Sequence, residues 1–150
     1  MIPTNRLLGL LDERRPWAKS AADALAAGDY ELAEAEAKTH LAGEPDHAPA
    51  LLTLARALLA TRRHSDALPV LLRLRDLAPA DPTVHATLGD CLANTGRYGP
   101  AIHVYVEALR LQPDFLGAVE SLGQVVARRR EELHQAAQEP RHGHDATRDG

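Results

Sequence analysis

Small and apolar residues recur along most of this chain at spacings of three and four, which is the period of one face of an α-helix. The first such stretch begins near Pro16 and ends at Gly28, and a second runs from Tyr30 to just before Pro45. Two further stretches of the same kind follow, and then two more. The pattern therefore predicts successive pairs of amphipathic helices joined by short turns.

Three prolines mark the length of the recurring unit. Pro45, Pro79 and Pro113 follow one another at an interval of 34 residues, and many other positions match at that offset. Among the matching sets are Gly28, Arg62 and Gly96, then Tyr30, His64 and Tyr98, and also Ala33, Ala67 and Ala101. A fixed interval of this length is typical of repeat architectures, in which each unit packs only against its neighbours.

The register of the repeats also predicts the domain organisation. We expect a repeat domain over 15–137, made of repeats at about 14–47, 48–81 and 82–115 and a capping helix at 116–137. This helix should pack one face on the last repeat and turn the other to water. Residues 1–14 should form a short N-terminal helix that packs on the domain. Residues 138–150 lack apolar periodicity, which predicts a disordered tail.

Composition and charge exclude several classes of function. The net charge is −4, so the chain as a whole has no electrostatic attraction for nucleic acid. A single cysteine, Cys91, excludes an internal disulfide and a cysteine-based zinc site. The apolar run near the N-terminus is interrupted by Asn5, Arg6 and Asp12, which argues against a signal peptide or membrane insertion. The expectation is a soluble cytoplasmic protein.

The matched positions resemble the tetratricopeptide repeat (TPR), a helix pair with Leu-Gly on its first helix, Gly-x-Tyr at its turn and a closing proline. Arg62, His64 and His85 depart from this pattern, and Arg62 is expected to weaken the second turn. The resemblance implies an all-α fold, a right-handed α-solenoid of antiparallel helix pairs. The third repeat matches best, at Leu88, Gly89, Gly96, Tyr98, Ala101, Tyr105, Ala108 and Pro113.

In this family the first helices line a concave groove that usually recognises a peptide segment of a partner protein, and the resemblance implies the same here. The groove should be apolar towards its N-terminal side, where Leu25, Leu52 and Leu59 lie. Residues 5–13 of the chain or an external partner would cover this patch, and self-association through it or through the N-terminal helix is a further alternative. The candidate groove residues are Ala18, Ala22, Leu25, Leu52, Arg56, Leu59, Asp90, Asn94, Glu120 and Gln124.

Two subfamilies refine this expectation. Heat-shock chaperone adaptors clamp a C-terminal carboxylate with charged and amide side chains, whereas the matching slots here hold Ala18, Ala22, Thr53, Thr83 and Thr87. None of these can make a charge-assisted bond to a carboxylate, so that function is not expected. The third repeat also looks similar to bacterial type III secretion chaperones for translocator proteins. A secretion chaperone that holds an aggregation-prone client is therefore the alternative function.

Catalytic and cofactor signatures are absent from the sequence. It has no glycine-rich phosphate loop, nucleophile elbow or H-E-x-x-H motif, so we expect neither an enzyme nor a bound cofactor. His142, His144 and Asp145 lie in the polar tail, where a solvated segment is expected rather than a metal site. Arg128–Arg130 precede Glu131 and Glu132, which favours local ion pairs over a nucleic-acid surface. The sequence thus predicts a non-enzymatic adaptor that binds another protein.

Overall fold

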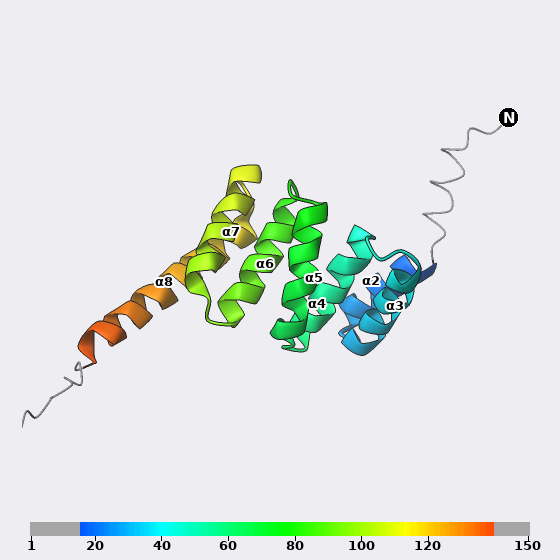
Figure 1. Ribbon diagram of the computed structural model, residues 1–150, viewed down its shortest axis with the longest axis horizontal. Coiled ribbons are helices and arrows are strands. Elements are labelled where there is room, and N and C mark those ends of the chain that lie inside the picture. Colours follow the sequence, from blue (N-terminus) through cyan, green and yellow to red (C-terminus); the bar gives the residue numbers. More distant parts are fainter. Residues whose placement is uncertain (1–15, 140–150) are drawn as a thin grey trace, which may run out of the picture.

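The computed structural model describes residues 16–139, which form seven α-helices and no strand. Figure 1 shows the helices arranged in chain order along an elongated body. They are α2 (Pro16–Ala27), α3 (Tyr30–Gly43), α4 (Ala48–Ala60), α5 (His64–Leu77), α6 (Pro82–Asn94), α7 (Tyr98–Leu111) and α8 (Leu116–Gln138). No helix in this part of the chain is long and apolar enough to cross a membrane. Three predictions concern residues outside this range. They are the N-terminal helix, the covering of the groove by residues 5–13, and the histidines of the C-terminal tail.

The helices form the all-α solenoid of antiparallel pairs that the sequence predicted. Within the described residues each helix packs on the next one along the chain, and the first helices of neighbouring repeats also meet, α2 with α4, α4 with α6 and α6 with α8. The second helices of neighbouring repeats, α3, α5 and α7, make no such contacts with each other. The row of helices therefore curves towards the first helices, which line its concave side.

The three turns inside the repeats share one geometry. Gly28 and Gly96 have φ values of 79° and 75°, and Arg62 occupies the same register position with a φ of 60°. The residue after each donates its N–H to a carbonyl five residues earlier, Asp29 to Ala24, Arg63 to Leu58 and Arg97 to Leu92. This is the Schellman ending of a helix, which favours glycine at the left-handed position. Arg62 thus adopts the glycine conformation without being a glycine.

Side-chain caps begin several of the helices. Asp29 accepts the N–H of Leu32, and Asp81 accepts the N–H of Thr83 one residue before Pro82 opens α6. These are common N-cap arrangements. The second repeat differs, because α5 begins at His64 with Arg63 in the cap position and no side-chain cap.

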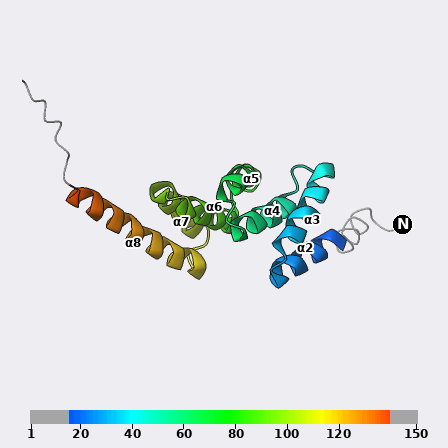
Figure 2. The ribbon, with the colours of Figure 1, turned by 90° about the horizontal axis from the view of Figure 1, so that it is seen from below.

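Helix α8 has buried residues only in its first half. Ala118 and Val125 are buried against the last repeat, whereas every residue from Val126 to Glu139 is exposed. Figure 2 shows this second half extending beyond the other helices. The outer side of α8, which the sequence predicted to face water, carries the exposed apolar residues Leu116, Val119, Val126 and Leu133.

Candidate functional site

The concave side carries two adjoining hollows of about 370 and 350 Å³. Leu59 on α4, Asp90 on α6 and Ser121 on α8 line both of them, so the hollows meet at these three residues. We call the pair the Asp90 groove. One end adds Arg56, Thr87 and Phe115, and the other adds Asn94, Gln124 and Arg128. First helices of three successive units therefore build this site.

Asp90 is held at the junction by its neighbours. The Tyr105 hydroxyl, from the buried side of α7, donates a hydrogen bond of 2.5 Å to Asp90 Oδ1. Burial raises the pKa of the Asp90 carboxyl above its ordinary value, and hydrogen bonds from Tyr105 and Ser121 offset only part of that rise. Burial and the neighbouring carboxylate also raise the pKa of Tyr105, so the phenol remains a donor. The Asp90 carboxylate is thus held in one orientation, and its hydrogen bonds replace only part of the hydration that it loses on burial.

The lining of the groove combines this carboxylate with apolar and neutral polar surface. Leu59 and Phe115 are half-buried and give apolar contact beside the carboxylate. Arg56 and Arg128 are exposed at the two ends. Such an arrangement can accept a cationic or N–H donor group at its centre and an apolar side chain next to it.

The structure brings together five of the ten candidate residues. Arg56, Leu59, Asp90, Asn94 and Gln124 line the Asp90 groove, whose role in binding stays a prediction. Glu120 and Ala22 are exposed outside it. Ala18 lies on α2.

The expected apolar patch at the N-terminal side is smaller than predicted. Leu25, Leu52 and Leu59 are each half-buried and pack partly against core residues, and none of them is among the strongly exposed large apolar side chains. The pattern on a single helix does not reveal this packing.

Three groove residues were missed from the sequence. Ser121 follows Thr53 and Thr87 at the repeat interval, so its register position was an available signal. Tyr105 was assigned to helix packing, which is correct for its ring but overlooks its hydroxyl. Phe115 sits at the N-cap position of α8, outside the regular helix pattern.

Two of the three threonines in the carboxylate-clamp slots use their hydroxyls within their own helices. Thr53 donates to the carbonyl of Pro49 and Thr87 to that of Thr83, at 3.0 and 2.7 Å. Their hydroxyl protons are therefore engaged within the helix.

One group of side chains has the composition of a metal site. His40, Glu44 and His47 lie at the bend between α3 and α4, with a potential ligand atom from each within 4.8 Å of the others. However, His47 Nδ1 accepts the N–H of Ala50 as the cap of α4. A neutral imidazole that accepts at Nδ1 carries its proton on Nε2. A cation would therefore compete with the helix cap for the ring's lone pair.

Comparisons with known proteins agree with the repeat register. Two family models, each described as a tetratricopeptide repeat, match residues 24–91 and 82–115. No curated protein matches the sequence closely enough to be counted as a relative.

Several solved structures share the fold. An O-GlcNAc transferase mutant from Thermobaculum terrenum is 26% identical with a TM-score of 0.71, and the match covers 73% of this chain but only 21% of that one. MamA from Desulfovibrio magneticus RS-1 is 24% identical with a TM-score of 0.73, over 81% of this chain and 69% of that one. The first TPR of Spaghetti (RPAP3), bound to the HSP90 peptide SRMEEVD, is 14% identical with a TM-score of 0.71, over 75% and 89% of the two chains.

Proposed function

Because this chain belongs to the tetratricopeptide repeat family, we propose that it is a non-enzymatic interaction module whose Asp90 groove binds a segment of a partner protein. A structurally similar protein, the first TPR of Spaghetti, is known with a bound peptide, which supports this class of function. One observation carries the proposal. The two hollows meet at a single carboxylate, that of Asp90, whose hydrogen bonds replace only part of the hydration lost on burial.

Asp90 sets the chemistry of the ligand. Its carboxylate has lost water through burial, and the hydrogen bonds that it accepts from Tyr105 and Ser121 compensate only in part. A lysine, an arginine or a free amino group of the partner segment would supply the missing positive charge. Charge-assisted hydrogen bonds of this kind are about twice as strong as neutral ones.

The surroundings of Asp90 suggest the rest of the motif. Leu59 and Phe115 lie on the same side of the groove as Arg56 and favour an apolar residue next to the basic one. An acidic residue placed over Asp90 would be repelled and would leave both carboxylates short of water. The proposed ligand is therefore a basic and apolar segment rather than an acidic C-terminus.

Peptide selection followed by calorimetry tests the proposal. A random peptide library is selected on the immobilised chain, and the affinities of the recovered peptides are measured for the wild type and for Asp90→Asn. Asn keeps an acceptor for the Tyr105 hydroxyl but removes the charge, so binding should weaken about tenfold or more. Asp76→Asn, an exposed carboxylate on α5 outside the groove, is the matched control and should bind as the wild type does.

A second variant tests the apolar part of the groove. Leu59→Glu should abolish peptide capture while the helix content, read by circular dichroism, stays unchanged. Selected peptides without a basic residue, or binding that survives both Asp90→Asn and Leu59→Glu, would contradict the proposed site.

An adaptor and a secretion chaperone would use the same groove. The chaperone alternative stays a prediction, and it requires that a client protein become insoluble when this chain is absent. Co-expression of a captured partner with and without the chain distinguishes the two roles.

A further inference from the structure

The outer side of α8 presents a continuous stripe with the spacing of a coiled-coil seam. Its positions alternate at intervals of three and four residues, and all of them are exposed. We call this the α8 stripe. It consists of Leu116, Val119, Gly123, Val126, Arg130, Leu133 and Ala137.

The repeat register explains why this stripe exists. Val119 and Val126 occupy the positions of Leu51 and Leu58 in α4, where α5 packs on α4. Leu51 and Leu58 are 5% and 3% exposed, whereas Val119 and Val126 are 47% and 46% exposed. The α8 stripe therefore corresponds to the surface on which the second helix of a repeat packs, and no described helix of this chain covers it.

The surroundings of Gly123 also show that this packing surface is uncovered. In α6 the matching residue, Gly89, lies so close to Tyr105 of α7 that an added β-carbon would be 2.6 Å from the ring. Around Gly123 no atom lies within 4 Å of the corresponding position. In the third repeat the antiparallel helix α7 packs on this surface and places the ring of Tyr105 over the small residue.

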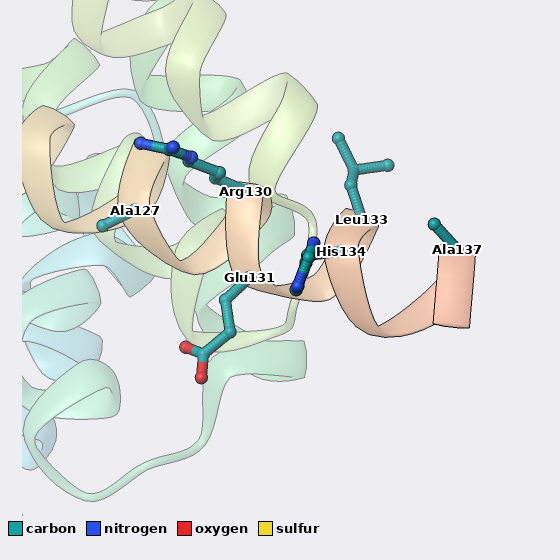
Figure 3. Close-up of a pocket in the computed structure, with 6 residues that line it drawn as sticks. All are labelled: Ala127, Arg130, Glu131, Leu133, His134 and Ala137. Carbon is teal, nitrogen blue, oxygen red and sulfur yellow. The ribbon is translucent and has the colours of Figure 1, made fainter. Parts of the chain in front are cut away.

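The last turns of α8 add a second argument. All residues from Val126 to Glu139 are exposed, and Leu133, which is 59% exposed, projects from this part of the helix (Figure 3). Ala127, Arg130, Leu133, His134 and Ala137 line an open hollow of about 640 Å³ there. A short helix without tertiary packing is marginally stable in water, so a partner on the stripe would stabilise this half.

We propose that the α8 stripe pairs, antiparallel, with the α8 stripe of a second copy of this chain. In the register centred near Arg128, Leu133 of each copy lies over Gly123 of the other, and Val119 lies over Ala137. Large side chains thus meet small ones at four layers, as α7 meets α6 through Tyr105 and Gly89. Arg130 lies against Val126 of the second copy and extends its charged end to water.

The flanking polar residues distinguish the two directions. Glu120 flanks the stripe near the start of α8, and His134 flanks it near the end. Antiparallel pairing sets Glu120 of one copy beside the imidazole of His134 of the other, whereas parallel pairing would set the carboxylate of Glu120 beside that of the second copy's Glu120. Residues 139–150 contain Ala146 as their single apolar residue, so their sequence lacks the apolar positions that a helix packed on the α8 stripe would need.

Sedimentation of matched variants tests the pairing. The wild-type chain should sediment as a dimer, and Val119→Glu or Leu133→Glu should sediment as a monomer that keeps the folded repeats. Val106 on α7 has the same exposed fraction as Val119, 47%, but lies away from the stripe, so Val106→Glu should remain a dimer. A monomeric wild type, or a dimer that survives Val119→Glu and Leu133→Glu, would overturn the proposal.

Cross-linking tests the direction of the helices. Val119→Cys and Ala137→Cys are made separately and treated with a short bis-maleimide, alone and mixed. In the antiparallel dimer only the mixture should cross-link, because residues 119 and 137 lie about 27 Å apart along the helix. Cys91 is buried and does not compete. Efficient cross-linking of either variant with itself would exclude the proposed pairing.

Discussion

Gly89 and Tyr105 are in such close contact that the glycine cannot gain a side chain without moving the ring. A β-carbon on Gly89 would lie 2.6 Å from the ring, and Tyr105 is fully buried. Gly89→Ala should therefore destabilise the fold by about 1–3 kcal/mol through overpacking between α6 and α7. Chemical unfolding followed by circular dichroism measures this change.

Gly123 provides a control in the same repeat position. No atom lies within 4 Å of its added β-carbon, and it sits inside a helix, where alanine is favoured over glycine by about 0.5–1 kcal/mol. Gly123→Ala should stabilise the chain by that amount at concentrations where it is monomeric. Equal effects of the two substitutions would refute this explanation of the packing.

Asp90 should lower stability as the pH rises through its titration. Burial raises the pKa of the folded Asp90 carboxyl above its ordinary value of 3.8, so between 3.8 and the folded pKa the native state holds more protons than the unfolded chain. Stability present at low pH is then lost as the carboxyl ionises. Asp90→Asn removes this contribution.

The measurement is the difference in unfolding free energy between wild type and Asp90→Asn, followed from pH 3 upwards. Relative to Asp90→Asn, the wild type should become progressively less stable as the pH passes through that window and level off above it. A difference that does not change with pH would mean that burial does not perturb Asp90.

Arg62 should gain stability on replacement by glycine. Its φ of 60° lies in the left-handed region, which costs a residue with a β-carbon about 1–2 kcal/mol, while glycine loses more chain entropy on folding. Arg62→Gly should therefore stabilise the second repeat by about 0.5–1 kcal/mol. Thermal unfolding measures it, and Arg62→Ala, which keeps the β-carbon, should show no comparable gain.

Cys91 should react slowly with thiol reagents in the native state. The residue is buried, burial raises the pKa of its thiol, and the Sγ lies 3.4 Å from the carbonyl of His64. Labelling with a chromogenic disulfide should accelerate on adding denaturant, in step with unfolding. Rapid labelling of the folded chain would show that α5 opens readily from α6.

The repeat interval was sufficient to predict the fold. Helix pairs, turn positions and the small residues at the helix contacts all recur in the sequence, because each unit packs only on its neighbours and meets the same constraints. The starts of α3 at Tyr30 and of α6 at Pro82 agree with the sequence pattern. The turn at Arg62 likewise places the start of α5 at His64.

The site depended on contacts that no single repeat contains. Leu59, Asp90 and Ser121 come from three successive units, and only their packing brings them to one groove. The exposure of Leu25 and Leu52 was overestimated for the same reason, since neighbouring repeats cover part of each side chain.

The sequence by itself determined the repeat, its register and the family, because these follow from local periodicity. The tertiary structure decided which polar groups are buried and which apolar groups stay exposed to water. Asp90 became a desolvated carboxylate under Tyr105. Val119 and Val126 stayed exposed, although their counterparts Leu51 and Leu58 are buried, because burial depends on whether a neighbouring helix is present and not on the residue's own position in the repeat.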